Sequence, residues 1–180
     1  MKNKINQLDK NGNRVGYWEH YHFDNGKLKS KGNYVDGKVH GYWEYYRENG
    51  QLQSKGNYDL NGNRVGYWES YYSDGKLYFK GNYEDGNKVG YWKYYYSNGK
   101  IWSEGNYDLN GNRVGYWENY YPNGKLKSKG NYENGNRVGY WESYYSDGQL
   151  WIKGNYDLNG IKVGYWEDYH DNGKLYRYII

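Results

Sequence analysis

The fold is decided by the stretch from Gly66 to Tyr83, which reads GYWESYYSDGKLYFKGNY. Two short runs rich in aromatic residues flank the dipeptide Asp74-Gly75. A dipeptide of this kind between such runs is the strongest short-range signal for a β-hairpin. A second turn-rich loop follows, and the pattern then begins again. The stretch therefore predicts a hairpin that is copied along the chain.

The tripeptide Gly-Tyr-Trp recurs at a spacing of 24 or 25 residues, and an Asn-Gly or Asp-Gly dipeptide follows each copy. A fixed period of this size indicates stacked supersecondary units, and connections this short require antiparallel neighbours. We therefore expect an all-β fold, an elongated antiparallel β-meander of tandem 24–25-residue hairpin repeats in a largely single-layer twisted sheet. The seven copies start at Gly16, Gly41, Gly66, Gly90, Gly115, Gly139 and Gly164.

The repeats predict one domain over residues 1–180. Residues 1–15 would form an N-terminal half-repeat or cap. The truncated last repeat would form a C-terminal cap, as repeat arrays require. Counting outward from its turn places Trp166 opposite Ile179 and Glu167 opposite Tyr178.

A two-residue type I′ turn, with positive φ at both residues, would fix the register of each hairpin. The fourth repeat supports this register. Lys93 stands where the other repeats have Glu, and its predicted partner Glu104 stands where most others have Lys, so the two charges have changed places together. The first repeat has one extra residue, which a three-residue loop at 24–26 would absorb. In the third repeat the count gives the pairs Glu69–Lys80, Trp68–Gly81 and Tyr71–Tyr78.

One face of the sheet carries a Trp and a strand Gly from each repeat. Each indole is expected to cover bare glycine backbone, which is a structural role; ligand stacking is the alternative reading. The Trp residues assigned to this role are Trp43, Trp68, Trp92, Trp117 and Trp141. The glycines assigned to it are Gly56, Gly81, Gly105, Gly130 and Gly154.

The other face carries Tyr columns and Glu–Lys pairs, and one position on it changes from repeat to repeat. Large aromatics at that position would mark an interaction surface, although they could equally serve to stiffen the sheet. The candidate binding residues are the variable aromatics Tyr78, Trp102 and Trp151, and the column tyrosines Tyr71, Tyr95 and Tyr144.

Catalytic chemistry is not expected. The chain has no cysteine, and no third ligand accompanies His20 and His22, so an exposed histidine pair is favoured over a metal site. His40 fills a slot that holds Val in other repeats. The carboxylates are regularly paired with Lys, and no phosphate-binding loop opens a helix. We predict no enzyme, no catalytic residue, no metal and no cofactor.

The amino-acid composition limits the classes of partner that the chain could bind. Aromatic residues make up 22% of the chain, so Tyr and Trp must supply the buried area that aliphatic side chains usually provide. The net charge of +4 is spread evenly and gives weak grounds for a nucleic-acid partner. No apolar run suggests a signal peptide or a membrane span, so a cytoplasmic location is expected.

The unit that begins at Tyr58, with Asp-Leu-Asn-Gly, Asn-Arg-Val-Gly-Tyr-Trp and then Asp74-Gly75-Lys76-Leu77, resembles the MORN repeat, specifically its bacterial variant. The stretch from Asp36 to Gly41 is closest to the standard pattern. The resemblance implies a stack of β-hairpins used for protein contact, scaffolding and association with phospholipid. Bacterial proteins with this variant include antitoxins of the YwqK type, which bind and neutralise a toxin. The high Tyr content and the Lys-Leu strands weaken the lipid reading.

Three functions remain open. The leading one is a non-enzymatic protein-binding or scaffolding module, antitoxin-like, whose partner would be a protein such as a toxin. The repeats also resemble choline-binding and glucan-binding modules, which would make the ligand a carbohydrate or cell-wall polymer. The third is a self-assembling structural protein that forms homo-oligomers through its sheet edges.

Overall fold

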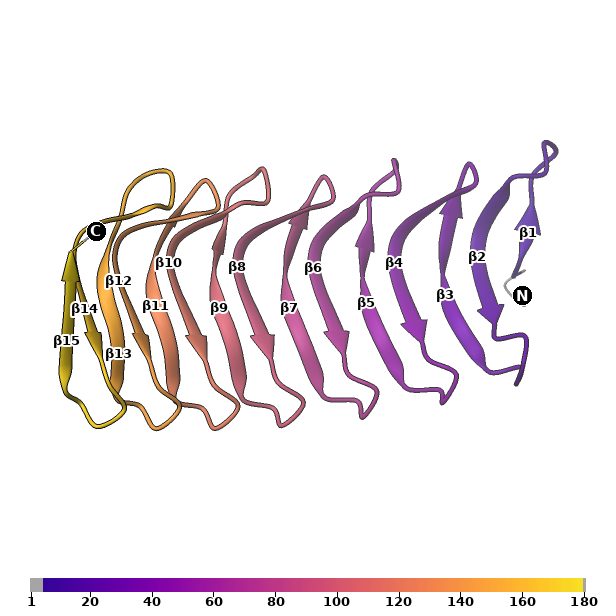
Figure 1. Ribbon diagram of the computed structural model, residues 1–180. Coiled ribbons are helices and arrows are strands. Elements are labelled where there is room, and N and C mark those ends of the chain that lie inside the picture. Colours follow the sequence, from indigo (N-terminus) through magenta and orange to yellow (C-terminus); the bar gives the residue numbers. More distant parts are fainter. Residues whose placement is uncertain (1–4, 180) are drawn as a thin grey trace. The chain divides into compact units, whose positions relative to one another are not determined.

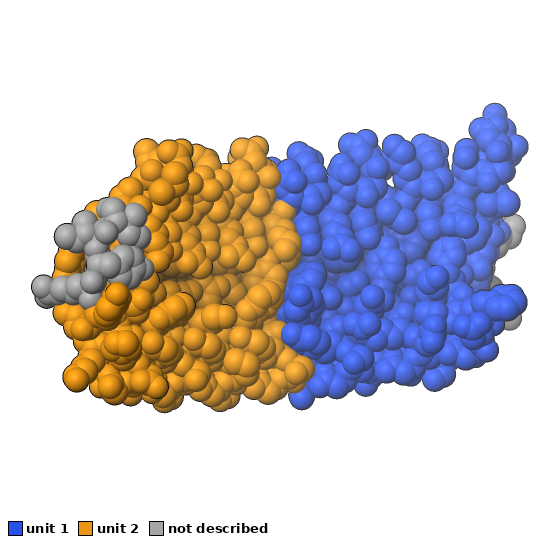
Figure 2. Space-filling model, viewed as in Figure 1, with its two compact units in different colours: residues 1–87 blue, residues 88–180 orange. Residues whose placement is uncertain are grey.

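The computed structural model describes residues 5–179, with side chains described as far as residue 176, and consists of strands joined by short loops (Figure 1). It divides into two compact units, residues 1–87 and residues 88–180, which Figure 2 colours separately. The predicted fold class, an all-β antiparallel meander of tandem hairpins, is confirmed.

In the first unit each strand pairs antiparallel with the next strand along the chain. Aromatic and β-branched residues suit such a ladder, because they pack well on a pleated surface. The strands are β1 (Gln7–Leu8), β2 (Arg14–Tyr21), β3 (Leu28–Val35), β4 (Lys38–Tyr46), β5 (Leu52–Tyr58), β6 (Arg64–Tyr71) and β7 (Leu77–Glu84).

The second unit follows the same rule of pairing in chain order. Its first strand begins at the last residue of the first unit. The strands are β8 (Asn87–Tyr95), β9 (Ile101–Tyr107), β10 (Arg113–Tyr120), β11 (Leu126–Glu133), β12 (Asn136–Tyr144), β13 (Leu150–Tyr156), β14 (Lys162–Tyr169) and β15 (Leu175–Ile179).

The Asp-Gly and Asn-Gly turns that follow the Gly-Tyr-Trp units are not the predicted type I′ turns. Between β6 and β7, Gly75 N donates to Tyr72 O and Tyr72 N donates to Lys76 O, which encloses a three-residue loop. Only Gly75 has a positive φ there, at 84°. Asp74 serves through its side chain, whose Oδ1 accepts the Lys76 N–H at 3.1 Å. This is a type I turn closed by a left-handed glycine.

The ladder then shifts by one residue beyond this turn. Tyr71 pairs with Leu77, whereas Ser70 pairs with Phe79, so Tyr78 is the extra residue of a β-bulge. The predicted pair of Tyr71 with Tyr78 is therefore wrong. The inner pairs Glu69–Lys80 and Trp68–Gly81 are correct, because the longer turn and the bulge shift the register in opposite directions and cancel.

The last hairpin shows what happens without that cancellation. Its turn also has three residues, but its register runs without a shift from the pair Tyr169–Leu175 to the pair Tyr165–Ile179. Trp166 therefore pairs with Tyr178 and not with Ile179. Glu167 pairs with Arg177 and not with Tyr178, so both predicted cap pairs are wrong by one residue.

The first hairpin also differs from its predicted loop. Gly26 N donates to His22 O and His22 N donates to Lys27 O, so four residues, 23–26, form the loop in place of the predicted three. The insertion is still absorbed at the turn, since Trp18 pairs with Gly32 as expected.

Type I′ geometry occurs in the short return loops. Val35 pairs with Lys38 around Asp36 and Gly37, whose φ values are 49° and 77°. Positive φ at both central residues is the mark of this turn, which suits the right-handed twist of the strands. Asn134 and Gly135 show the same pair of positive φ values.

The core is a layer of tryptophans on one face of each unit. Six indoles have exposed fractions of 2% or less, and Trp18 in β2 is only half-buried. A layer of large rings on one face leaves the other face of the sheet open, because successive side chains of a strand point in opposite directions. The buried indoles belong to Trp43, Trp68, Trp92, Trp117, Trp141 and Trp166.

Candidate functional site

Trp68 shows how one indole is held. It lies over Gly56 of the preceding strand, where an added Cβ would stand 2.2 Å from the indole Cδ2. Its Nε1 donates to Asn57 O at 3.0 Å, and the Tyr58 ring meets it edge-on at 5.1 Å. The Arg64 guanidinium covers the indole at 4.4 Å from the ring centroid. The indole is therefore enclosed by groups of its own repeat and of the preceding one.

The same arrangement recurs in the other repeats. A Cβ on the glycine would again come within 2.4 Å of the indole, which leaves no room for a side chain at that position. The structure thus places each of these Trp residues over the Gly of the preceding hairpin. Trp43, Trp117 and Trp141 also pair along the backbone with the Gly of their own hairpin, whereas Trp166 pairs with Tyr178. The pairs are Trp43 over Gly32, Trp117 over Gly105, Trp141 over Gly130 and Trp166 over Gly154.

The basic residue that precedes Val-Gly-Tyr-Trp was overlooked by sequence reasoning. Arg113 and Arg137 lie 4.3 and 4.5 Å from the ring centroids of Trp117 and Trp141, and Lys162 lies 4.3 Å from that of Trp166. A cation over an indole face is attracted by the ring quadrupole. It stands four residues before the Trp in six of the seven Gly-Tyr-Trp repeats, the exception being Trp43, and this regular position was the available signal.

A second overlooked contact joins neighbouring hairpins near their tips. In several repeats the side chain of the residue directly before the hairpin loop donates a hydrogen bond to the next repeat. The acceptor is the backbone carbonyl of the Tyr that ends the Trp-bearing strand there. In the first unit Arg47 donates to Tyr71 O at 2.7 Å. In the second unit Tyr96, Tyr121 and Tyr145 donate to the carbonyls of Tyr120, Tyr144 and Tyr169 at 2.7, 2.7 and 2.8 Å. These side chains satisfy carbonyls where the strands of adjacent hairpins no longer pair.

The opposite face carries a network of Tyr, Glu and Lys. Glu69 accepts hydrogen bonds from Tyr67 at 3.3 Å and from Tyr71 at 2.6 Å, and it forms an ion pair with Lys55 at 2.9 Å. Lys80 is the backbone neighbour that the sequence predicted, but the ion pair forms with the Lys of the preceding hairpin. Burial favours the neutral acid, yet the hydrogen bonds from Tyr71 and Lys55 outweigh it and lower the pKa of Glu69.

The fourth repeat reverses this arrangement. Lys93 forms its ion pair with Glu104 at 2.9 Å inside one hairpin, as the charge exchange predicted. The exchange places Glu104 beside Glu118 of β10, so two carboxylates are neighbours in the ladder. Tyr120 donates to both, at 3.3 Å to Glu104 and 2.7 Å to Glu118.

The variable aromatics lie elsewhere than expected. As bulge residues they contact rings of the Trp-bearing face. Tyr78 lies 4.9 Å from the Tyr72 ring, and Trp102 lies 5.7 Å from the ring of Tyr94. Trp102 and Trp151 keep exposed fractions of 37% and 44%. The other candidate binding residues, Tyr71, Tyr95 and Tyr144, pair with Leu77, Ile101 and Leu150.

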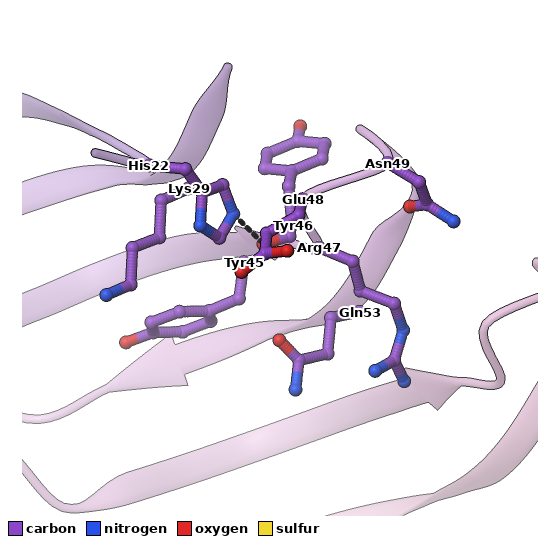
Figure 3. Close-up of a pocket in the computed structure, with 8 residues that line it drawn as sticks. All are labelled: His22, Lys29, Tyr45, Tyr46, Arg47, Glu48, Asn49 and Gln53. Atoms are coloured by element: carbon purple, nitrogen blue, oxygen red, sulfur yellow. Dashed lines mark hydrogen bonds between the residues drawn. The ribbon is translucent and has the colours of Figure 1, made fainter. Parts of the chain in front are cut away.

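The bulge position also borders hollows between hairpin tips. In the first unit Lys29 and Gln53 line one of about 460 Å³, together with Tyr45 and Arg47 (Figure 3). Its His22 ring lies 3.0 Å from Tyr46 O, which Figure 3 marks with a dashed line. The residue at the bulge therefore decides how much space is left between two tips.

The histidines take part in packing. His20 stacks between Trp18 and Trp43 at centroid distances of 5.6 and 6.3 Å, and it lies within hydrogen-bonding distance of the Tyr34 hydroxyl. Burial, together with Arg14 and Lys29, lowers its pKa. Among the described residues, no group of three or more His, Cys, Asp or Glu could hold a metal ion.

The geometry defines the class of protein as a tandem β-hairpin repeat array. The family model for the MORN repeat variant matches seven segments, and the chain belongs to the MORN repeat family in this variant form. The segments are residues 14–36, 39–60, 64–85, 88–109, 113–134, 137–158 and 162–179. No curated protein matches the chain.

Membership places the chain among structural repeat modules that generally mediate contacts with proteins or membrane lipids. In the part of the chain that the structure describes, no helix is long and apolar enough to cross a membrane.

Proposed function

We propose that this chain is a non-enzymatic protein-binding module that recognises its partner through the bulge residues on the Trp-bearing face. The supporting observation is that these positions, apart from the half-buried Tyr78, are exposed and that they differ between repeats, whereas the Trp, Gly and basic residues around them recur. Exposed aromatic side chains supply large contact area and are enriched where proteins bind each other. Trp102 and Trp151 are the residues we expect to contribute most.

The finer proposal is that the partner is a toxin, which binding neutralises. Its support is the resemblance of the repeats to the bacterial MORN variant found in antitoxins of the YwqK type. The bulge position provides a means of choosing one partner, since its side chains range from Lys29 and Gln53 to Trp102.

Capture from the native cell tests the proposal. The immobilised chain should retain one protein in stoichiometric amount, identified by mass spectrometry, and the double variant Trp102→Ala, Trp151→Ala should lose it. Phe23→Ala is the matched control, because Phe23 is an exposed aromatic in the first hairpin loop. Thermal unfolding confirms that each variant is folded.

Recovery of wall polymer alone, or of the chain itself alone, would overturn the proposal in favour of a carbohydrate-binding or self-assembling protein. Equal capture by the double variant and the control would contradict the assignment of Trp102 and Trp151. A captured protein whose toxicity persists in the complex would contradict the antitoxin role.

A further inference from the structure

The Tyr–Glu–Lys face holds hollows that have the same composition in different repeats. The one in the first unit has about 410 Å³ and is lined by Tyr42, Lys55, Gly56, Asn57, Tyr67 and Glu69. The second unit has two more, of about 340 and 220 Å³, built from the corresponding residues. These hollows lie on the face opposite the bulge residues. Their lining residues are the same from one repeat to another, whereas the bulge residues differ.

The walls of each hollow are tyrosines of successive Gly-Tyr-Trp units. Tyr116 and Tyr140 line one hollow of the second unit, and Tyr140 and Tyr165 line the other. These rings are half exposed, at 50%, 49% and 42%. A strand glycine lies between each pair of rings. Its Cβ direction points to the indole on the opposite face, so this position adds no side chain to the hollow.

The charges that line the hollows are already paired. Lys129 and Glu142 form an ion pair at 3.0 Å in one hollow, and Lys153 and Glu167 form one at 2.9 Å in the other. Glu142 also accepts hydrogen bonds from Tyr140 at 3.1 Å and Tyr144 at 2.6 Å. Each hollow therefore has no net charge. This is complementary to an uncharged ligand and unsuited to a nucleic acid or an anionic membrane.

Two kinds of group are left to contact a ligand. The first is the exposed part of each Tyr ring. The second is the side-chain amide of the strand Asn, since Asn131 and Asn155 are exposed and their amides bond to no other described residue. With the carboxylates already occupied, few polar groups remain to bind the many hydroxyls of a sugar. A ligand with compact apolar rings and backbone carbonyl acceptors fits better.

The spacing of the rings identifies such a ligand. Equivalent tyrosines are two strands apart, which corresponds to about 9.6 Å across the sheet. A polyproline II helix has three residues per turn and a rise of 3.1 Å per residue, so every third side chain points the same way at intervals of about 9.3 Å. An extended β-strand repeats about every 6.7 Å and would fall out of step. Proline also brings no N–H group that would need a partner.

We infer that the face formed by Tyr116, Tyr140 and Tyr165 binds a proline-rich segment in the polyproline II conformation. The segment runs across the strands and places every third residue in a hollow. Its prolines pack between the Tyr rings, and the amides of Asn131 and Asn155 donate to its carbonyls. Aromatic grooves are a general means of binding this helix, because it is already ordered before it binds.

Titration of the full chain with a fluorescein-labelled peptide of twelve prolines tests the inference by fluorescence anisotropy. Saturable binding is expected. A Gly-Ser peptide of the same length and label should not bind. Tyr140→Ala should weaken binding by about fivefold or more, because Tyr140 lines two hollows and large aromatic contacts dominate such interfaces. Trp151→Ala is the matched control from the opposite face and should bind the peptide unchanged.

Asn131→Asp and Asn155→Asp provide a second test that leaves the rings in place. A carboxylate cannot donate to the peptide carbonyls, so each variant should bind more weakly while its thermal unfolding stays near that of the parent chain. No saturable binding, equal binding of the Gly-Ser peptide, or displacement of the proline peptide by a glucan oligosaccharide would overturn the inference. Loss of peptide binding with partner capture retained separates this site from the bulge surface.

Discussion

Trp68 lies over Gly56 so closely that a Cβ on residue 56 would stand 2.2 Å from the indole Cδ2. The indole is fully buried, with an exposed fraction of 0%, and the φ of Gly56 is outside the left-handed region. Glycine is therefore required at this position for space and not for backbone conformation. The contact joins two consecutive hairpins, so it belongs to the stacking of repeats and not to one hairpin alone.

Substitution of this glycine should destabilise the protein even by the smallest step. Gly56→Ala is expected to lower the free energy of unfolding by about 1–3 kcal/mol, because the added methyl overpacks a site closed by a rigid ring. Urea unfolding measures the loss. Gln53→Ala, an exposed position on the same strand, is the control and should change little. Equal stability of the two variants would show that the indole can move aside.

Acid should weaken the Tyr–Glu–Lys network. Burial of Glu44 favours a higher pKa for its carboxyl, but hydrogen bonds from Lys31 and Tyr46 outweigh burial and lower the pKa. The pKa of Glu69 is lowered in the same way. A carboxylate whose pKa is lower in the folded state stabilises the fold above its unfolded pKa, about 4.3, and loses that contribution as the pH falls through the folded value.

The urea midpoint should therefore decline as the pH is lowered from about 5, where the unfolded carboxylates begin to take up protons. Glu69→Gln should show a shallower decline, because one titrating group is gone. An identical decline in the variant would show that Glu69 does not contribute to the acid sensitivity.

The charge exchange of the fourth repeat leaves a local conflict that one substitution should relieve. Glu104 and Glu118 are neighbours across the ladder, and like charges placed opposite each other are destabilising. Glu118→Gln should raise the free energy of unfolding by about 0.2–1 kcal/mol at low salt. The gain should shrink at high salt, since salt screens charges near the surface. Destabilisation at low salt would contradict this explanation.

Most of the fold could be predicted from the sequence because every copy of the repeat carries the same structural signals. The period, the Gly-containing turns and the alternation of side chains all indicate one meander, and the Trp68–Gly81 and Glu69–Lys80 pairs were predicted correctly. Seven copies of a consistent local pattern leave little room for another topology.

The errors lie where turn length and bulge compensate each other. A two-residue turn and a three-residue turn followed by a bulge give the same inner register, so the charge exchange of Lys93 and Glu104 could not distinguish them. The difference moved Tyr78 to the other face of the sheet. It also misplaced the partners of Trp166, whose hairpin has the longer turn without the bulge.

The contacts between repeats were the harder part of the site to predict. Counting within one hairpin gives Lys80 as the neighbour of Glu69. The carboxylate of Glu69 instead forms its ion pair with Lys55 of the preceding hairpin, which is also its direct neighbour in the ladder. The cations over the indoles were missed for the same reason, because a side chain such as that of Arg64 reaches its ring by its direction and not by strand pairing.

A double-mutant cycle on Trp68 and Gly56 tests most directly whether these two residues hold consecutive repeats together. Trp68→Ala alone should cost about 3–5 kcal/mol of unfolding free energy, and Trp68→Leu provides a milder variant if the first fails to fold. In either background Gly56→Ala should cost almost nothing, because the ring that it would strike is gone. A cycle with strongly coupled changes is the predicted result. Additive changes would contradict the claim.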